Sequence, residues 1–318
     1  MDTLSDCVNG LWSDLREDEH FPAVRPLLAH YTSLSTMESI FRGEEIWMSH
    51  PFLMNDDEEL KWGIVEGVKR IRTNEHLARG FGSASNYAGF LEAVESAKDK
   101  EGGTNALDTY VACFCQHEKN DKDGLLSMWR AYGADGGGVA IVFDTSALVE
   151  DDQSPLIIAP VRYATTEERY AWIDRALNIC SKAVAAFGSS ANHVNIGHIA
   201  YAYFQRLRYF ALFTKHVAFR EENEWRVVYF PDRDEKQRYA ELLSYAITQK
   251  GIQPKLKLRL GLNAIGGPLL LEDAVSSILL GPTAGSLLSA HALKRMLRNL
   301  GKPGLADKIG FSSTPYRP

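Results

Sequence analysis

The chain has 318 residues, of which 45% are hydrophobic and 24% are charged. These proportions are typical of a globular protein, and they exclude a disordered chain, a collagen-like chain and a coiled coil. The length suffices for one large hydrophobic core or for two of ordinary size.

The net charge of -6 is unevenly distributed along the chain. Residues 1–200 hold 17 basic and 31 acidic side chains, a net charge of -14, whereas residues 201–318 hold 18 and 10, a net charge of +8. Two interpretations follow. Either the two parts pack together and their fields largely cancel, or the basic part binds a polyanionic partner.

No window of 18 or more apolar residues occurs, so we expect no transmembrane helix. The first 18 residues are acidic and lack a basic region followed by an apolar run, so we expect no signal peptide. Four cysteines are too few for a disulfide framework, and we expect a reducing, cytoplasmic setting.

The first half of the chain opens with a polar N-terminal arm at residues 1–25, with a short helix around 11–15. A short helix then begins with Ser35 and Glu38, which fit a capping box, and Gly43 is the expected C-terminal stop. The predicted strands of this half are 27–32, 46–49, 110–115 and 138–143, and its further helices are 58–72, 86–97 and 125–132. Residues 51–57 and 101–105 are predicted loops.

In the second half, Thr165 and Glu168 form a second possible capping box, which opens a helix that extends to about Phe187. The other predicted helices are 193–215, 235–249 and 286–300, and the predicted strands are 156–163, 224–230, 255–260, 275–280 and 309–311. Basic residues alternate with leucine in the strand at 255–260.

This pattern predicts an α+β fold around a single mixed or antiparallel sheet. We favour one domain over residues 26–318, with a helical insertion at about 165–215, over two separate domains. The chain shows no internal repeat and no low-complexity linker.

Strong catalytic signatures are absent from the sequence. The chain has no P-loop, no G-x-S-x-G elbow, no H-E-x-x-H and no paired C-x-x-C motif. Residues 133–138 are rich in glycine, but a strand follows them, so the helix N-terminus that would hold a phosphate is missing. We interpret this segment as a turn.

Cys113, Cys115 and His117 raise the question of a metal site. A structural zinc site needs four ligands, and no second cluster is visible. Cysteines two positions apart share one face of a strand, where buried cysteine is a common small hydrophobe. We therefore predict no metal site, and nothing marks a base beside a nucleophilic cysteine.

Three segments are unusually polar for their places beside apolar strands: residues 30–33, 54–59 and 220–226. In a strand from Glu224 onward, Glu224 and Arg226 share one face and Trp225 lies on the other. A carboxylate and a guanidinium opposite a tryptophan suggest a cleft. The alternative is an edge strand that carries a solvated salt bridge.

These segments resemble an uncharacterised bacterial family, whose motifs are H-Y-T-S, M-N-D-P-x-E, C-F-S, M-W-x-x-Y, F-x-x-E-x-E-W-R and S-x-x-P-Y. The matching residues in this chain are His30–Ser33, Met54–Asp56 with Glu59, Cys113–Cys115, Met128, Trp129 and Tyr132, Phe219 with Glu222 and Glu224–Arg226, and Ser313 with Pro315 and Tyr316. Asp57 stands where proline is usual, and Cys115 where serine is usual. The resemblance spans residues 27–316.

The layout of that family is similar to the ADP-ribosyltransferase superfamily, in which an early strand carries His-x-Thr/Ser and a late strand carries a catalytic glutamate. The resemblance implies NAD as substrate, Glu224 and Glu222 as the catalytic carboxylates, and His30 and Thr32 as ligands of ribose hydroxyls. It assigns nicotinamide stacking to Trp47, Trp129 or Tyr132, and pyrophosphate binding to Arg220 or Arg226. Tyr31, Ser33 and Asn55 complete the implied NAD contacts.

The implied chemistry is physically consistent. Cleavage of the nicotinamide–ribose bond builds positive charge on the sugar, which a fixed carboxylate stabilises. The implied acceptor of ADP-ribose is a nucleic acid, a protein or water, and such an enzyme could act as a bacterial toxin or antiphage defence effector.

Two other functions stay open. One is a non-catalytic nucleic-acid or ligand sensor on the same fold, suggested by the basic residues Arg206, Arg208, Lys215, Arg220 and the cluster Lys294–Arg298. The other is a metal-dependent hydrolase that uses Asp56, Glu58, Glu59 and Glu222.

Overall fold

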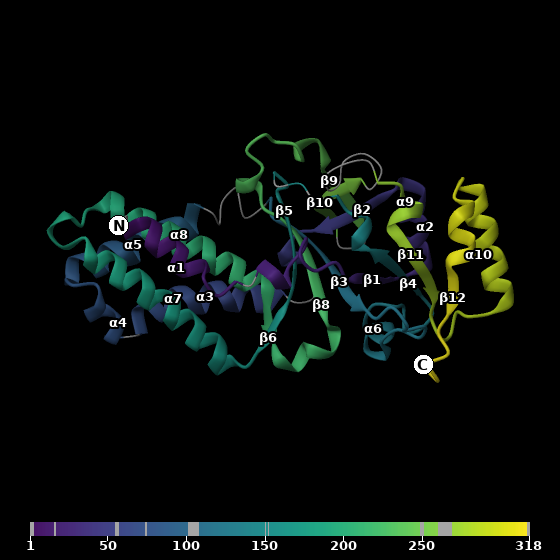
Figure 1. The fold of residues 1–318 in the computed structure, drawn as a ribbon, viewed down its shortest axis with the longest axis horizontal. Coiled ribbons are helices and arrows are strands. Elements are labelled where there is room, and N and C mark those ends of the chain that lie inside the picture. Colours follow the sequence, from purple (N-terminus) through teal and green to yellow (C-terminus); the bar gives the residue numbers. More distant parts are fainter. Residues whose placement is uncertain are drawn as a thin grey trace. The chain divides into compact units, whose positions relative to one another are not determined.

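The structure is a computed structural model that describes residues 3–15, 17–54, 57–73, 75–100, 108–149, 151, 153–248, 251–259 and 269–316. The chain forms two compact units from interleaved segments (Figure 1). The sheet unit comprises Asp18–His50, Tyr110–Pro160 and Arg220–Pro318, and the helical unit comprises Met1–Glu17, Pro51–Thr109 and Val161–Phe219.

The sheet unit is built on ten of the described strands, in the order β12-β11-β4-β1-β3-β2-β10-β9, with β8 paired to β3 and to β5. Their bounds are β1 Leu27–Thr32, β2 Glu45–Ser49, β3 Tyr110–His117, β4 Val139–Asp144, β5 Leu156–Pro160, β8 Glu224–Tyr229, β9 Leu243–Thr248, β10 Gly251–Arg259, β11 Val275–Leu280 and β12 Ile309–Phe311. The described pairs of this sheet are antiparallel except β11 with β12. The mixed, largely antiparallel sheet is not closed into a barrel, and the predicted α+β class is confirmed.

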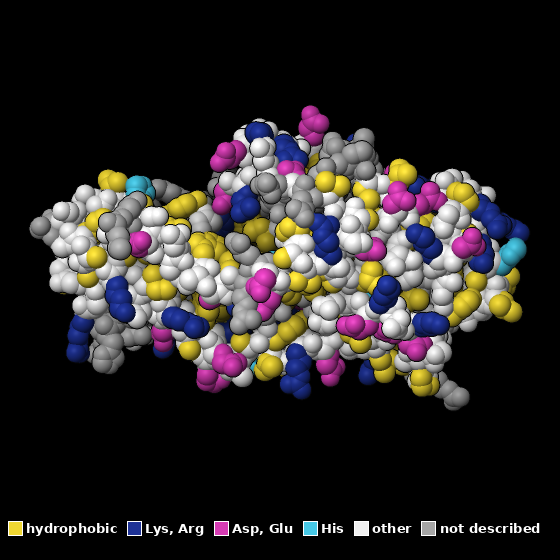
Figure 2. All heavy atoms as spheres, viewed as in Figure 1, with side chains coloured by type: hydrophobic (Ala, Val, Ile, Leu, Met, Phe, Trp, Pro, Cys, Tyr) yellow, Lys and Arg dark blue, Asp and Glu magenta, His cyan; other side chains and the backbone are white. Residues whose placement is uncertain are grey.

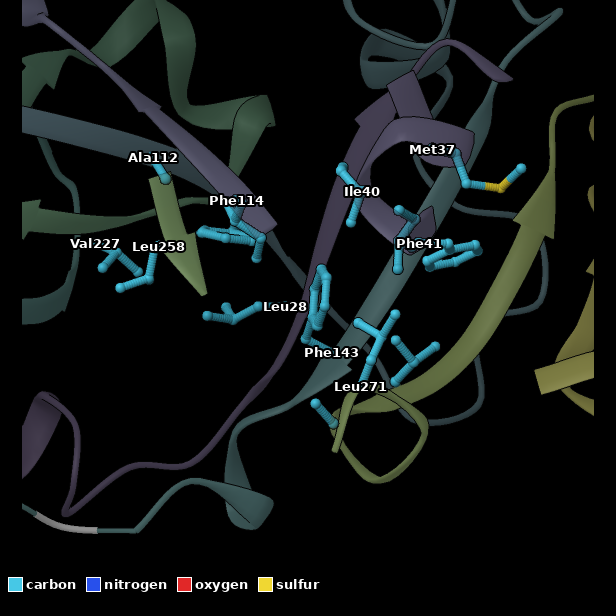
Figure 3. Close-up of a cluster of buried hydrophobic side chains, with 14 of the residues drawn as sticks. Leu28, Met37, Ile40, Phe41, Ala112, Phe114, Phe143, Val227, Leu258 and Leu271 are labelled. Atoms are coloured by element: carbon cyan, nitrogen blue, oxygen red, sulfur yellow. The ribbon is translucent and has the colours of Figure 1, made fainter. Parts of the chain in front are cut away.

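The α-helices of the sheet unit are α2 Leu34–Gly43, α6 Leu126–Ala131, α9 Leu271–Ala274 and α10 Leu287–Asn299. One face of the sheet packs its apolar side chains with those of α2 and α9, as Figure 3 shows for Leu28, Phe41, Phe114 and Leu271. Burial of each such side chain contributes about 1.5–3 kcal/mol to stability. The other face packs Tyr31 with side chains of α6.

Helix α2 begins earlier than the capping-box pattern predicts. The N-cap is Ser33, whose Oγ accepts a hydrogen bond from the backbone N–H of Thr36 at 3.1 Å. Glu38 instead pairs with Arg42 one turn later. The left-handed residue that ends the helix is Glu44, with φ of 53°, and not Gly43. The chain turns at Ser33 because β1 ends at Thr32.

The helical unit contains α1 Thr3–Trp12, α3 Asp57–Thr73, α4 Glu75–Gly80, α5 Ala84–Lys100, α7 Thr166–Ala186 and α8 His193–Phe213, with a short parallel pair of β6 Arg162–Ala164 and β7 Thr214–His216. Thr165 and Glu168 form the predicted capping box of α7. The predicted insertion at 165–215 corresponds to α7 and α8. These helices share one core with α1, α3 and α5, which the sequence analysis did not group with them.

Close approach of α3 to α8 requires glycine. A Cβ on Gly67 would lie 2.4 Å from Cδ1 of Leu207, and one on Gly63 would lie 2.8 Å from Cβ of Ala211. The phenol of Tyr203 donates a hydrogen bond to the carbonyl oxygen of Gly67 at 3.0 Å. The two helices therefore pack with their backbones near contact.

Three predicted elements are wrong. The short helix expected around 11–15 is α1, which covers Thr3–Trp12. Residues 156–163 form β5 and β6, which belong to different sheets. The predicted α-helix at 235–249 is not formed, since Ala240–Leu242 is a 3-10 helix and β9 covers Leu243–Thr248. The predicted loop at 101–105 lies outside the described residues.

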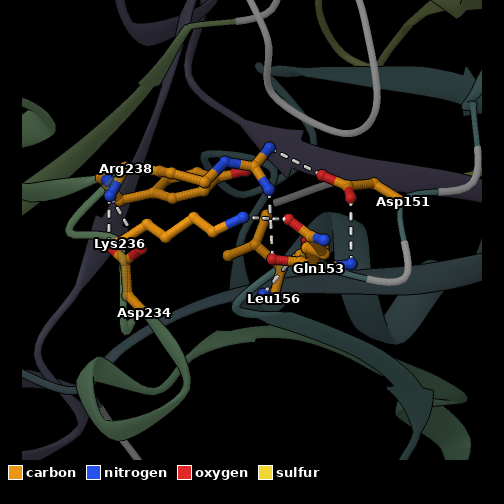
Figure 4. A network of polar contacts seen from close by, with 8 residues as sticks. Asp151, Gln153, Leu156, Asp234, Lys236 and Arg238 are labelled. Atoms are coloured by element: carbon orange, nitrogen blue, oxygen red, sulfur yellow. Dashed lines mark hydrogen bonds and ion pairs between the residues drawn. The ribbon is translucent and has the colours of Figure 1, made fainter.

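Side-chain hydrogen bonds explain why the segment after β8 is not a helix. The Asp234 carboxylate accepts from the backbone N–H groups of Arg238 and Tyr239 at 2.8 and 2.9 Å. Arg238 and Lys236 reach across to Asp151 and Gln153 at 2.6 and 2.7 Å (Figure 4). Such local bonds give the backbone an alternative to helical bonding.

The short 3-10 helices are Glu17–Glu19, Pro51–Leu53, Thr145–Ala147, Gly188–Ser190, Val217–Glu222, Pro231–Arg233, Ala240–Leu242 and Pro303–Lys308. No helix in the described ranges combines the length and the apolar character that a membrane span requires.

Candidate functional site

Strand β8, which carries Glu224 and Arg226, lies inside the sheet. It pairs with β3 on one side and β5 on the other, and all six of its residues are buried. The alternative of an edge strand with a solvated salt bridge is therefore wrong. Trp225 packs into the apolar core, so Glu224 and Arg226 lie on the opposite face, as strand alternation predicts.

Glu224 and Arg226 form a two-point ion pair. Nε of Arg226 donates to Oε1 of Glu224 at 2.7 Å, and Nη2 donates to Oε2 at 3.1 Å. Only 6% of Glu224 and 4% of Arg226 are exposed. The fork geometry fixes the orientation of the carboxylate.

The sheet splits beside this pair, between β1 and β3. The two strands are in register only up to Ala29 opposite Cys115, and β3 meets β2 at Val111 opposite Ser49. Residues 112–114 of β3 therefore have no register partner in β1 or β2, strands that the structure describes in full. Across β3, Cys115 stands opposite Glu224, so the row at the end of the split runs Ala29, Cys115, Glu224.

His30 follows this row but lies on the opposite face of the sheet. Its ring contacts that of Phe114 with centroids 5.7 Å apart, and Phe114 stands opposite Trp225. Thr32 shares this face by alternation. We call it the His30 face, and the other the Glu224 face. The structure therefore does not bring the His30 and Glu224 side chains into one pocket.

The imidazole of His30 spans the split toward β3. Its Nδ1 lies 3.3 Å from the carbonyl oxygen of Cys113, which can only accept, so Nδ1 donates. Burial lowers the pKa of His30, and this hydrogen bond opposes the shift less strongly. The neutral ring therefore presents Nε2 as an acceptor.

Tyr31 and Trp129 pack against each other on the Glu224 face. Their rings meet edge to face at 4.8 Å, and the Tyr31 hydroxyl accepts from the backbone N–H of Leu125 at 2.9 Å. Burial raises the pKa of Tyr31. Trp129 is fully buried, and its indole N–H donates to the carbonyl oxygen of Asp123 at 2.8 Å. Both residues hold α6 on the sheet, and Trp129 has no ring face open for nicotinamide.

The C-terminal segment is tied to the same region. The backbone N–H and hydroxyl of Ser313 donate to one carboxylate oxygen of Asp123 at 2.6 and 2.7 Å, which lowers the pKa of Asp123. Tyr316 donates to Asp135 in the glycine-rich turn, where its ring would meet a Cβ on Gly136 at 2.8 Å. The turn interpretation of residues 133–138 is confirmed, since β4 follows it.

Trp47 lies on the Glu224 face of β2, because its neighbours Ile46 and Met48 pack into the opposite core. The indole is 47% exposed, and Nζ of Lys257 lies 4.2 Å from its ring centroid. On the same face, Nζ of Lys255 donates to Ser49 Oγ at 2.8 Å, and burial lowers its pKa.

The site residues that the sequence predicts do not include Lys255 and Lys257. The alternation of basic residues with leucine at 255–260 could have pointed to them, because it predicts one cationic face on the strand. The register completes the assignment, with Lys257 opposite Trp47 and Lys255 opposite Ser49.

The remaining predicted site residues are dispersed. Ser33 caps α2, Tyr132 is half-buried just after α6, and Arg220 is exposed in the 3-10 helix before β8. Glu222 is half-buried and acts electrostatically on Cys115. Asn55 lies outside the described residues, as do Asp56 and the side chains of Glu58 and Glu59.

Cys115 is a protonated thiol in this environment. Burial, with Glu222, Asp121 and Glu224 nearby, raises its pKa to about 12. A thiolate is required both for nucleophilic attack and for metal binding, so Cys115 is suited to neither. Within the part of the chain that the structure describes, no three His, Cys, Asp or Glu side chains come together as a metal site.

The face that carries His30 also holds a cavity of about 60 Å³. Leu28, Ala112, Phe114 and Val227 contribute to its walls, which are apolar apart from Asp144 and Thr145. Such a cavity is too small and too apolar for a nucleotide, whose pocket occupies about 300–1,000 Å³.

A comparison with known protein families gives a match over part of the chain. Residues 128–227 match the family model described as "Protein of unknown function (DUF2971)". The expected relation to an uncharacterised family is confirmed over this segment, which begins at Met128 and Trp129 and ends within β8. No curated protein matches the chain, and no solved structure matches it.

Proposed function

We propose that the sheet unit is an NAD-consuming, ADP-ribosyltransferase-like enzyme, with Glu224 as its essential carboxylate. The observation that carries the proposal is the split between β1 and β3. It opens beside the row of Ala29, Cys115 and Glu224, and the segment His30–Ser33 follows directly. Paired Cα atoms are about 5 Å apart, so the two strand segments implied by the resemblance lie about 10 Å apart across β3.

The opposite faces of His30 and Glu224 determine how NAD would bind. A dinucleotide in contact with both would have to enter between β1 and β3, beside residues 112–114, and would not occupy the 60 Å³ cavity of the His30 face. Nε2 of His30 would accept from a ribose hydroxyl on one side. Glu224 would stabilise the positive charge that develops on the sugar as the nicotinamide leaves.

Arg226 has a different task in this proposal from the one that the resemblance implies. Its guanidinium already donates to both oxygens of Glu224. In this proposal Arg226 therefore orients the carboxylate and does not bind the pyrophosphate. Lys255 and Lys257 offer the cations for the pyrophosphate on the same face, beside the exposed ring of Trp47. Transfer to a nucleic acid, a protein or water completes the reaction, with a role as toxin or defence effector.

Release of free nicotinamide from labelled NAD tests the proposal. We expect Glu224→Gln to lower the rate by about 100-fold or more, because a fixed charge at the reacting sugar is lost. Glu221→Gln, which changes an exposed carboxylate nearby, should leave the rate unchanged. His30→Gln keeps the ion pair intact and tests the site from the other face. Full activity of the Glu224 variant would exclude this assignment.

One observation favours a second function, a non-catalytic ligand sensor. Both oxygens of Glu224 are occupied by Arg226, as in a structural ion pair. A sensor would bind NAD or ADP-ribose in calorimetry and release no nicotinamide.

A further inference from the structure

Helix α10, in the sheet unit, carries a stripe of basic side chains. His291, Lys294, Arg295 and Arg298 follow the spacing i, i+3, i+4, i+7, which confines them to an arc of about 100° on a helix of 3.6 residues per turn. Ala290, Leu293 and Leu297 are buried on the other side. Residues 287–299 include no acidic residue. We call these four side chains the α10 stripe.

The basic side chains of the α10 stripe gather on one helix face without carboxylate partners. Several exposed basic side chains elsewhere pair with acids, for example Arg42 with Glu38, Lys69 with Glu66, Arg72 with Glu95 and Arg259 with Glu45. Within the described ranges, Lys294, Arg295 and Arg298 form no ion pair with a carboxylate. The polar contact of Arg295 is with His291 at 3.2 Å. The stripe therefore keeps its positive charge unneutralised.

A groove of about 450 Å³ runs beside the stripe, between α10 and α2. His291 and Arg295 line one side, and Arg42 lines the other. Glu38, which pairs with Arg42, and Asn299 also line it, and apolar side chains, Leu288 and Met296 among them, complete the lining. Figure 2 shows basic and histidine side chains gathered over α10. The groove therefore combines a cationic wall on α10 with apolar surface.

We propose that the α10 stripe and its groove bind the sugar–phosphate backbone of a single-stranded nucleic acid. Phosphates would contact Lys294, Arg295 and Arg298, and sugars or bases would pack on the apolar lining. The proposal rests on the proposed function only in naming this nucleic acid as the acceptor of ADP-ribose. Binding itself requires no catalytic activity.

The shape of the site favours a strand over a membrane. Leu287 and Leu288 are 88% and 77% exposed at the start of α10, and a basic helix with exposed leucines can also lie on an anionic bilayer. A flat bilayer cannot reach the lining of a groove between two helices, whereas a flexible strand can follow it.

Fluorescence anisotropy with a labelled oligoribonucleotide of mixed sequence tests the proposal, with salt raised from about 50 to about 200 mM. We expect the logarithm of the affinity to fall against the logarithm of salt with a slope of about -2, as for three phosphate contacts on a single strand. The triple variant Lys294→Glu, Arg295→Glu, Arg298→Glu should bind at least about tenfold more weakly. The single variant Arg298→Gln should reduce the magnitude of the slope by about 0.7, the contribution of one phosphate on a single strand.

The matched control is Lys98→Glu, Arg175→Glu, Lys182→Glu, which makes the same change of charge at exposed positions of helices α5 and α7. This control should bind like the wild type. Equal loss in both triple variants, binding insensitive to salt, or binding to phosphatidylserine vesicles without binding to the oligonucleotide would each overturn the proposal. Nicotinamide release without nucleic acid is measured in parallel. Its absence from every protein would reject the enzyme while leaving the binding result intact.

Discussion

Arg226 donates two hydrogen bonds to the carboxylate of Glu224, and both side chains are buried on one face of β8. Removal of a charge from water is costly, and the two hydrogen bonds of this pair offset part of that cost. The pair thus has a structural consequence that holds whether or not Glu224 takes part in catalysis.

We predict that Arg226→Met lowers the free energy of unfolding by about 3–5 kcal/mol, because it removes two hydrogen bonds and a positive charge from a buried carboxylate. The double variant Glu224→Gln, Arg226→Met should recover much of this loss. Arg42→Met, which breaks an exposed ion pair with Glu38, should cost less than about 1 kcal/mol. Urea denaturation measures all three. A double variant as unstable as the single one would contradict this account.

The positions of Glu224 and His30 show where sequence-based prediction stops. Alternation within β8 correctly separates Glu224 and Arg226 from Trp225, because it is a property of one strand. The faces of His30 and Glu224 depend on two registers, of β1 with β3 and of β3 with β8. A shift of one residue in either register would exchange the faces, and no local pattern fixes both.

Helix boundaries show the same limit on a smaller scale. Thr165 and Glu168 suffice to predict the start of α7. Their capping box begins directly after β6 ends at Ala164, and no second capping box competes with it there. At the start of α2, both Ser33 and Ser35 are acceptable N-caps. The spacing of Glu38 from Ser35 fits a capping box and therefore favours Ser35, although the N-cap is Ser33. The pairing of β1 with β4 ends at Thr32, so the helix can begin directly after it, and Ser33 becomes the N-cap.

Tyr31→Phe tests the structural role of the second residue of H-Y-T-S. The variant keeps the edge-to-face contact with Trp129 but removes the acceptor for the Leu125 N–H. We expect a loss of about 1–2 kcal/mol in stability, since a half-buried N–H loses its hydrogen-bond acceptor. Tyr245→Phe, at an exposed tyrosine, should change little. An unchanged urea midpoint for Tyr31→Phe would show that the N–H finds another partner.

Gly67→Ala tests the close packing of α3 on α8. The new Cβ would lie 2.4 Å from Leu207, so the helices must separate or Leu207 must change rotamer. We expect a loss of about 1–3 kcal/mol. Gly197→Ala is the matched control, because that glycine lies within α8 with nothing within 4 Å of an added Cβ. This control should gain up to about 1 kcal/mol from helix propensity. Equal effects of the two substitutions in thermal unfolding would contradict close packing.

The half-buried imidazole of His30 predicts a pH dependence of stability. Its pKa in the folded protein is below the ordinary value of 6.5, chiefly because of burial. Below pH of about 6.5 the unfolded chain therefore binds a proton that the folded chain does not, and stability falls as the pH falls. This window is separate from that of Asp14, Asp123 and Asp151, whose lowered pKa values cost stability only near and below about pH 4.

Urea midpoints between about pH 7.5 and 5 measure the effect. We expect the wild type to lose at most about 1.4 kcal/mol per pH unit through this group, the slope of one proton. His30→Asn should give a flatter profile over the same range, because asparagine does not titrate. Parallel profiles for the two proteins would mean that His30 is protonated equally in the folded and unfolded chains. A neutral His30, and the Nε2 acceptor that the proposed NAD site requires, would then be excluded.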